Sequence, residues 1–403
     1  MEPSTTQRIL EPRQLTVLTT SKCTAACRHC CMNSTPDRDE TLTWEQLEDH
    51  LKQAFDNFRL RVVIFAGGEP MLLGETLYKA IRYCKRRGAV TRIVTNAYWA
   101  ANRTHAQKKL DELRAAGLDE LNLSTDDYHT DFIKIEAVNN AYQLAQQMDF
   151  SAVVLANCFG PQSEMNPEHV KKTFGGDMTM RYDDDGAALE LKQKRGKQLV
   201  VLSNARLQRL GKGYEGLRED ELAPMTAEQL DDLGDSTGGC PWAVRSPAIS
   251  AKGHFVACCG FEVEDNPILD YGDLAKTPMK DLVNAADNDL LTNMIALLGP
   301  IRIMRLLQEV CPDEISFPRS YRTYCEVCSD LVTIKQNRDA LYKHGGKFAN
   351  LVLEAREYLR DNYRSKGVVD YPPLKVTLEK PPTPVQNPAS ADAAGNSAPL
   401  MEG

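Results

Sequence analysis

The stretch QLTVLTTSKCTAACRHCC, residues 14–31, joins a short apolar run to a loop that holds four cysteines and one histidine. The apolar run has the composition of a buried β-strand, and the first cysteine follows it within a few residues. In parallel α/β proteins, functional side chains gather beyond the C-terminal ends of the strands. The stretch therefore predicts a strand whose C-terminal end carries a thiol-rich binding loop.

Similar apolar runs recur downstream and alternate with amphipathic helical patterns. Thr43, before WEQ, predicts a capping box at the start of the first helical pattern. Strand–helix–strand repetition predicts a parallel sheet with right-handed crossovers. Six such units are too few for a closed eight-stranded barrel, so we expect an α/β fold that forms a partial (β/α)6 TIM-like barrel. The five later runs are RVVIFAGG, TRIVTN, DELNLST, SAVVLAN and KQLVVLSN.

The composition changes along the chain predict five parts. Cysteines return among Gly and Pro after residue 237, and a helical pattern follows them. The last residues are rich in Pro, Ala, Asn and Ser and have few large apolar side chains, which predicts disorder. We expect an N-terminal extension at 1–13, the barrel at 14–237, a small Cys-rich domain at 238–333, a helical segment at 334–365 and a disordered tail at 366–403.

The charge and the N-terminal sequence exclude several classes of protein. The 403-residue chain has a net charge of −8 and a pI of about 5.5, which disfavours binding to a phosphate backbone. The sequence has no signal-peptide pattern and no stretch long enough to cross a bilayer. We therefore expect a cytoplasmic protein with no nucleic-acid or membrane partner. In a reducing cytosol its 12 cysteines are thiols, and thiols in groups favour metal binding or catalysis.

The first cysteine group has the spacing C-x3-C-x2-C, formed by Cys23, Cys27 and Cys30. Three thiolates on one loop can hold three corners of a cubane iron–sulfur cluster. One iron then lacks a protein ligand, and an open position on a metal is where a substrate or cofactor binds. The alternative is a zinc site that uses three of these cysteines with His29 or Cys31.

A second motif follows the next apolar run. VVIFAGGEP ends in Gly67, Gly68, Glu69 and Pro70, and two glycines after a strand let the backbone approach a ligand without interference from Cβ. Alone, these residues are equally consistent with a plain strand-to-helix turn. Together, the cysteine loop after the first strand and GGEP after the second resemble the radical S-adenosylmethionine (radical SAM) superfamily, over roughly residues 14–205.

The resemblance implies a cofactor set and a chemistry. The three cysteines of the loop would ligate a [4Fe–4S] cluster, and S-adenosylmethionine would chelate its fourth iron. Gly67, Gly68 and Glu69 would receive the methionyl ammonium. An external reductant such as flavodoxin or ferredoxin would reduce the cluster. Reductive cleavage would then give a 5′-deoxyadenosyl radical that abstracts hydrogen from a substrate carbon, while the protein binds and orients the reactants.

Polar residues at two later strand ends fit the same resemblance less specifically. Asn96 follows TRIVT, where the family often places cofactor contacts. Ser124 and Asp126 match a fourth-strand position where polar side chains commonly meet the ribose or the carboxylate of the cofactor. Each has an alternative as a helix cap, since Ser and Asp are common caps. His129 faces the substrate or lies on the surface, and we expect the surface.

The C-terminal region holds C-x12-G-x4-C followed by a C-x2-C pair. Four thiolates in two pairs suit a fully ligated cluster or a tetrahedral zinc ion. The arrangement is similar to the twitch domain, a shortened SPASM module of some radical SAM enzymes, and the similarity implies a second, auxiliary [4Fe–4S] cluster. Cys259 and Cys311 are spare, and either could replace a ligand, Cys311 before Cys259. The four expected ligands are Cys240, Cys258, Cys325 and Cys328.

The resemblance leaves three functional interpretations open. Only 22 residues precede Cys23, too few for the leader-binding domain that many peptide maturases carry. We therefore expect oxidation or rearrangement of a small molecule from a natural-product or cofactor pathway. The first alternative is maturation of a ribosomal peptide or protein by crosslinking, epimerisation or oxidation, in which Cys158 could donate hydrogen. The second is a non-enzymatic iron–sulfur or zinc protein that carries electrons or binds a partner.

Overall fold

The computed structural model describes residues 8–175, 180–182, 188–223, 225–230, 232 and 239–365. The disordered tail expected at 366–403 and the first seven residues of the expected N-terminal extension lie outside the described residues.

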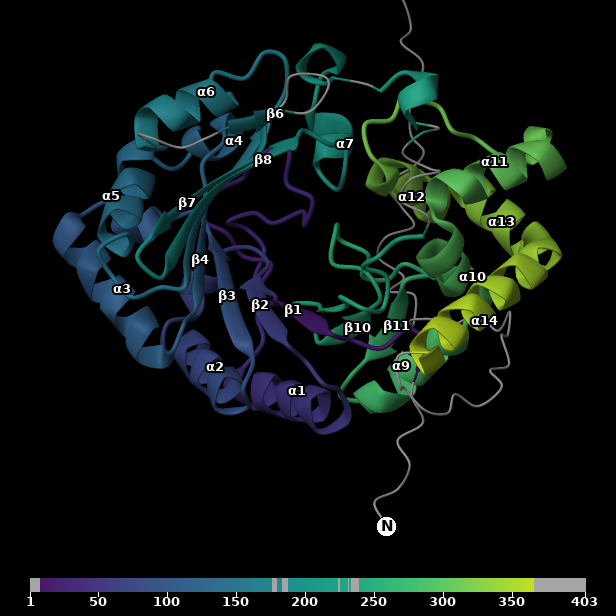
Figure 1. Ribbon diagram of the computed structural model, residues 1–403, viewed down its shortest axis with the longest axis horizontal. Coiled ribbons are helices and arrows are strands. Elements are labelled where there is room, and N and C mark those ends of the chain that lie inside the picture. Colours follow the sequence, from purple (N-terminus) through teal and green to yellow (C-terminus); the bar gives the residue numbers. More distant parts are fainter. Residues whose placement is uncertain are drawn as a thin grey trace, which may run out of the picture.

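A twisted sheet of 11 strands runs through the described part of the chain (Figure 1). Six strands of the N-terminal half pair in parallel, each with the next along the sheet. This arrangement confirms the α/β fold with a parallel, barrel-like sheet. The six strands, in sheet order, are β1 (Gln14–Leu18), β2 (Val62–Ala66), β3 (Val90–Thr95), β4 (Glu120–Ser124), β5 (Ala152–Phe159) and β8 (Gln198–Arg206).

Helices follow the parallel strands and cover the outer face of the sheet (Figure 1). The predicted capping box is confirmed, because the Thr43 side chain accepts a hydrogen bond from Gln46 N and the Gln46 side chain accepts one from Thr43 N. The helices of this half are α1 (Trp44–Asn57), η1 (Pro70–Leu73), α2 (Glu75–Arg86), η2 (Tyr98–Ala100), α3 (Arg103–Ala116), α4 (Asp127–Thr130), α5 (Ile135–Ala145), α6 (Pro167–Val170), η3 (Lys171–Gly175), α7 (Gly213–Gly216) and η4 (Glu219–Glu221).

Antiparallel strands extend the sheet at both edges. On one side β7 (Ala188–Arg195) pairs with β8, and β6 (Met180–Tyr182) pairs with β7. On the other side the short strand β9 (Ala248–Ile249) pairs in parallel with β1. The strands β10 (His254–Val256) and β11 (Asp270–Asp273) follow β9 in antiparallel order. The Cys-rich region, expected as a separate small domain, therefore continues the barrel's own sheet.

A helical layer completes the C-terminal half, drawn in green to yellow in Figure 1. Among the described residues no single helix is long and apolar enough to span a membrane, although α10 with η5 and α11 pass that test together as a pair bent by 113°. The helices are α9 (Met279–Asn288), α10 (Leu290–Asn293), η5 (Met294–Leu298), α11 (Pro300–Val310), η6 (Pro312–Glu314), α12 (Tyr324–Thr333), α13 (Lys335–His344), η7 (Gly345–Phe348) and α14 (Ala349–Ser365).

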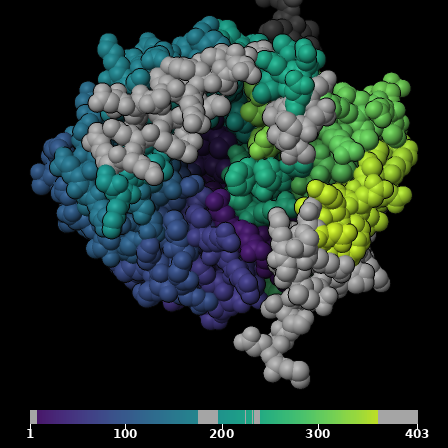
Figure 2. All heavy atoms as spheres, in the orientation of Figure 1, coloured from purple at the N-terminus to yellow at the C-terminus, as the bar shows by residue number. Residues whose placement is uncertain are grey.

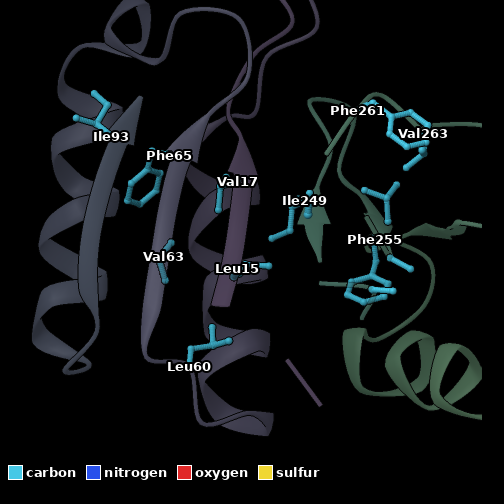
Figure 3. Close-up of a cluster of buried hydrophobic side chains, with 14 of the residues drawn as sticks. Leu15, Val17, Leu60, Val63, Phe65, Ile93, Ile249, Phe255, Phe261 and Val263 are labelled. Carbon is cyan, nitrogen blue, oxygen red and sulfur yellow. The ribbon is translucent and has the colours of Figure 1, made fainter. Parts of the chain in front are cut away.

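One apolar core joins the two halves. Val17 of β1 and Phe65 of β2 are fully buried, and the same core continues through Ile249 and Phe255 on the C-terminal side (Figure 3). Burying apolar surface is the main driving force for such packing. The shared core and the shared sheet hold the two cysteine-bearing regions in a fixed relation to each other.

Candidate functional site

A cavity of about 790 Å³ opens at the C-terminal ends of the parallel strands. Figure 2 shows a hollow on this face between the blue barrel and the green C-terminal half, with purple N-terminal residues at its base. The volume lies within the range typical of ligand sites. Cysteines of both groups line the cavity: Cys23, Cys27, Cys30 and Cys31 of the N-terminal loop, and Cys259 and Cys325 of the C-terminal region.

The first cysteine group is carried by the loop that follows β1. Backbone hydrogen bonds fix the loop: Cys23 N donates to Thr35 O at 3.0 Å, and Cys30 N donates to Cys27 O at 3.2 Å. Burial raises the pKa of Cys23 to about 11 and raises that of Cys27 further. Cys23 and Cys27 are thus costly to ionise unaided, and a bound cation would stabilise their thiolates.

The two glycines after β2 clamp the start of this loop. Gly68 N donates to Thr20 O at 2.6 Å, and Glu69 N donates to Lys22 O at 2.9 Å. A Cβ on Gly68 would lie 2.0 Å from Lys22 O, closer than any real contact. The sequence predicted that these glycines let the backbone approach a ligand. Gly67 and Gly68 do line the cavity, but their closest approach is to the chain's own loop.

Glu69 lies beside the cavity and does not line it. Its buried carboxylate accepts hydrogen bonds from Met71 N at 3.0 Å, Thr95 Oγ1 at 2.8 Å and Asn96 N at 2.9 Å. Burial raises the pKa of Glu69 to about 7, although these hydrogen bonds lower it. The side chain therefore ties the end of β2 to the end of β3.

Asn96 reaches from the end of β3 to the cysteine loop. Its Nδ2 donates to Thr24 Oγ1 at 3.0 Å and lies 3.6 Å from Cys23 Sγ. A hydrogen bond to a cysteine sulfur is one of the contacts by which proteins tune bound metals. The structure thus brings Asn96 to the first cysteine group.

The end of β4 carries a connected polar group. Ser124 lines the cavity, and Asp126 places both carboxylate oxygens 2.8 Å from His129 Nδ1. Asp126 Oδ2 also lies 3.5 Å from His29 Nε2. Burial opposes ionisation of Asp126, but the charges and hydrogen bonds of the two histidines outweigh it and hold its pKa well below the usual range.

The helix-cap interpretation of Asp126 is confirmed, because its side chain caps α4 by accepting a hydrogen bond from His129 N, and the residue also lines the cavity. His129 was expected at the surface, and the structure instead buries most of it in the cavity wall. The signal that could have placed it there is its position three residues after a capping aspartate, which returns the side chain to the cap.

The four expected cysteines of the C-terminal region come together from three segments. Cys240 lies in a loop, Cys258 follows β10, and Cys325 and Cys328 lie one turn apart on α12. A Cβ on Gly260 would lie 3.7 Å from Cys258 Sγ and 3.9 Å from Cys325 Sγ, so both sulfurs flank this glycine. Burial raises the pKa of Cys325 to about 12, and the neighbouring charges of Cys240 and Cys259 raise it as well.

The spare cysteines do not lie where the sequence suggested. Burial and Glu314 raise the pKa of Cys311, and no other cysteine contributes to that rise, so Cys311 stands apart from the group. Cys259 instead lines the cavity beside Cys325. Cys31 lies there too: burial raises its pKa to about 12, and the charges of Cys30, Cys325 and Cys259 contribute.

The sulfurs of each cysteine group are less closely spaced than those around a bound zinc ion. Sulfurs bound at 2.3 Å around a tetrahedral zinc ion lie about 3.8 Å apart. Within the described ranges, the groups of three candidate ligand atoms that approach within 4.8 Å of one another contain no cysteine. Those groups are His29, Asp126, His129 and His254, Asp265, Asp270. In neither cysteine group, therefore, do three sulfurs lie as close together as around a tetrahedral zinc ion.

Cys158 lies at the end of β5 and lines the same cavity. Burial raises its pKa, with smaller contributions from the charges of Asp126 and Cys31. The thiol is therefore held protonated at neutral pH, near Asp126 and the N-terminal cysteine loop.

Residues that sequence reasoning missed fix α12 to the barrel. The buried carboxylate of Glu326 accepts hydrogen bonds from Arg209 N and Arg322 N, each at 2.6 Å. Thr323 Oγ1 donates to Gln208 Oε1 at 2.9 Å. These contacts tie the helix that carries Cys325 to the chain that leaves β8. The contacts of Arg209 with Glu326 and of Gln208 with Thr323 join residues more than 100 positions apart, so no local sequence pattern predicts them.

Comparison with known proteins gives matches that include the cysteine loop. The radical SAM superfamily model matches residues 17–149. YydG of Bacillus subtilis (strain 168), named for a proposed role in peptide biosynthesis, is 25% identical over 120 residues. That match covers 30% of this chain and 38% of YydG, so the chain matches well under half of this relative's length.

Solved structures with a similar arrangement include BtrN in complex with AdoMet and 2-DOIA, with a TM-score of 0.40 and 13% identity over 72% of this chain and 89% of BtrN. SuiB of Streptococcus suis bound to S-adenosylmethionine has a TM-score of 0.35 and 15% identity over 68% of this chain and 65% of SuiB. The family match covers the C-x3-C-x2-C loop and GGEP together. Residues 17–149 of this chain, which contain both motifs, thus match the radical SAM superfamily.

Proposed function

We propose that this protein abstracts a hydrogen atom from a substrate held between its two cysteine groups and then oxidises or rearranges that substrate. The observation that carries the proposal is one cavity lined by Cys23, Cys27 and Cys30 of the first group and by Cys325 of the second. Cofactor and substrate must meet at near-contact distance for hydrogen transfer, and a shared cavity satisfies that requirement.

The superfamily binds a [4Fe–4S] cluster and S-adenosylmethionine. When bound, the reduced cluster supplies the electron that cleaves S-adenosylmethionine into methionine and a 5′-deoxyadenosyl radical. In this chain Cys23, Cys27 and Cys30 would hold the cluster, and the chain offers no fourth ligand from the same motif. Gly67 and Gly68 expose backbone to the cavity, where the amino group of the cofactor can bind.

Around the cofactor, the chain's own side chains orient the reactants and exclude water. Asn96 fixes the cysteine loop through Thr24 and Cys23. Ser124 offers a hydroxyl on the cavity wall, while the Asp126 carboxylate is already engaged by His129 and His29. We propose that Ser124 meets the cofactor directly and that Asp126 acts on it through the two histidines.

The C-terminal group would hold an auxiliary [4Fe–4S] cluster. Four thiols, Cys240, Cys258, Cys325 and Cys328, are enough to ligate every iron of a cubane. Such a cluster supplies an electron acceptor for the substrate radical. Gly260, against Cys258 and Cys325, keeps Cβ bulk away from the sulfurs on the cavity side.

The size of the cavity favours a compact substrate. Its 790 Å³ must take the adenosyl part of the cofactor as well as the substrate. What remains accommodates a small molecule or one residue of a peptide. We propose a small molecule first, as the sequence indicated.

A second candidate, modification of a peptide, is supported by the match to YydG, whose name refers to peptide biosynthesis. In that case Cys158 is placed to return a hydrogen atom to a carbon radical of the substrate. The S–H bond would break, a C–H bond would form, and the remaining thiyl radical would need one electron and one proton from the auxiliary cluster and solvent.

The test is anaerobic reconstitution of the full chain with iron and sulfide, followed by S-adenosylmethionine and dithionite. We expect 5′-deoxyadenosine to form, and we expect Cys27→Ala to abolish it while Cys84→Ala, a buried thiol away from both groups, leaves it unchanged. Absence of 5′-deoxyadenosine at full iron loading, with and without candidate substrates, would contradict the proposal. Comparing small molecules and peptides for acceleration of this reaction separates the two substrate classes.

A further inference from the structure

Cys30 and Cys31 are consecutive residues whose side chains pack in different places. Cys30 packs with Cys23 and Cys27 in a small apolar cluster around Tyr128. Cys31 packs instead against the main core, as the C-terminal cysteines do. The charges of Cys325 and Cys259 raise the pKa of Cys31, as that of Cys30 does, so Cys31 lies near cysteines of the C-terminal region as well as beside Cys30.

The backbone at this point is locked from two sides. Cys31 O accepts a hydrogen bond from Glu262 N at 2.9 Å, and Lys212 N donates to Cys30 O at 3.0 Å. Gly211, at φ +54°, fits so closely that a Cβ would lie 2.6 Å from Cys31 O. With consecutive carbonyls held by different segments, the two side chains cannot exchange positions.

An ion pair fixes the loop to the segment that follows Cys259. Arg38 Nη1 lies 3.2 Å from Glu262, and Arg38 Nε lies 3.2 Å from Glu40. Glu262 is three residues after Cys259, so the same residue that binds Cys31 O also anchors the C-terminal cysteines. Cys31, Cys259, Gly260 and Cys325 all line the cavity.

We infer that Cys31 serves the C-terminal cysteine group, where its sulfur contacts the cluster that the four expected ligands hold. This inference rests on the proposed function, because it requires a cluster at that group. Neighbouring sulfur and hydrogen-bonding groups set the reduction potential and the spectrum of an iron–sulfur cluster. Cys31 is thus a positioning residue that places the N-terminal loop against the second redox site.

The test isolates the C-terminal cluster in the full-length chain. Replacing Cys23, Cys27 and Cys30 by Ala removes the first site, and we expect about four irons to remain. In this background, Cys31→Ala is compared with Cys84→Ala, which removes a buried thiol that no other cysteine influences. We expect Cys31→Ala to change the g-values of the reduced cluster and to shift its midpoint potential, or to lower its iron content, while Cys84→Ala changes neither.

Superimposable spectra and equal potentials for Cys31→Ala and its parent, at about four irons each, would overturn the inference and leave the auxiliary cluster standing. A parent variant that folds by circular dichroism but holds no iron would overturn the auxiliary cluster and this inference together. Cys31→Ser preserves size and polarity, so a spectral change shared by both substitutions, at unchanged circular dichroism, assigns the effect to the sulfur.

Discussion

The two cysteine groups of this protein contribute to one cavity but are built differently from the sequence. The N-terminal group takes three sulfurs from eight consecutive residues, 23–30, on one loop. The C-terminal group takes its sulfurs from Cys240, Cys258 and the pair on α12, which the fold must bring together. The difference teaches that a site built from one local motif can be predicted from the sequence. A site assembled from distant segments becomes evident only in the folded structure.

Substitution of a cysteine in the N-terminal group is expected to have the largest effect on activity and iron content. Cys27→Ala leaves two thiols of the loop motif, and we expect formation of 5′-deoxyadenosine to fall below detection because no cluster with an open iron can form. Iron content should fall from about eight to about four per chain. Iron analysis together with chromatography of the nucleoside measures both. Retention of eight irons with full activity would show that Cys31 or another thiol replaces Cys27.

Substitution of a cysteine in the C-terminal group is expected to have the next largest effect, on iron content. Cys258→Ala should halve the iron content while S-adenosylmethionine cleavage at the first site continues, because the two groups have separate ligands. Cys311→Ala is the matched control, since no other cysteine raises the pKa of this buried thiol. Loss of iron from Cys311→Ala, equal to that from Cys258→Ala, would contradict the placement of Cys311 outside the group.

The clamp on the N-terminal loop predicts a change in stability. Gly68→Ala forces Cβ to within 2.0 Å of Lys22 O, and a backbone atom cannot rotate away as a flexible side chain can. We expect the free energy of unfolding in urea to fall by about 3 kcal/mol, the upper end of overpacking costs.

The control for this change is Gly88→Ala. Gly88 has φ +86° but nothing within 4 Å of a Cβ. It should lose only about 1 kcal/mol, from the left-handed backbone. Equal losses of unfolding free energy in the two variants would show that close contact with the cysteine loop is not the reason for a glycine at position 68.

Glu69 predicts a smaller effect, which depends on pH. Burial raises the pKa of Glu69 to about 7 in the folded protein, from an ordinary value of 4.5. Its contribution to stability is therefore complete below about pH 4.5 and is lost as the pH rises through about 7. Relative to Glu69→Gln, which does not titrate here, wild type should lose at most about 3 kcal/mol between pH 5 and pH 8.

Urea unfolding of both proteins at the two pH values measures this difference. A difference between wild type and Glu69→Gln that stays constant with pH would show that the carboxyl is ionised throughout, held by its three hydrogen-bond donors.

Much of the fold and the local half of the site could be predicted from the sequence. Apolar runs mark the parallel strands because those strands are buried on both faces, and C-x3-C-x2-C needs no tertiary information. The spacing of His129 from Asp126 is a local signal, but the contact of Asp126 with His29, from a loop 100 residues before His129, is not. The placement of Cys31 and Cys259 in one cavity depends on how β9 pairs with β1 and β10 with β9, pairings that the sequence pattern does not encode.

The central claim is that the N-terminal group leaves one metal position for the cofactor. Its most direct test is electron paramagnetic resonance of the reduced full-length chain with Cys240, Cys258, Cys325 and Cys328 replaced by Ala, so that only the first site holds iron. Addition of S-adenosylmethionine should change the g-values of the signal. A signal that stays identical at saturating S-adenosylmethionine, with about four irons bound, would contradict the account.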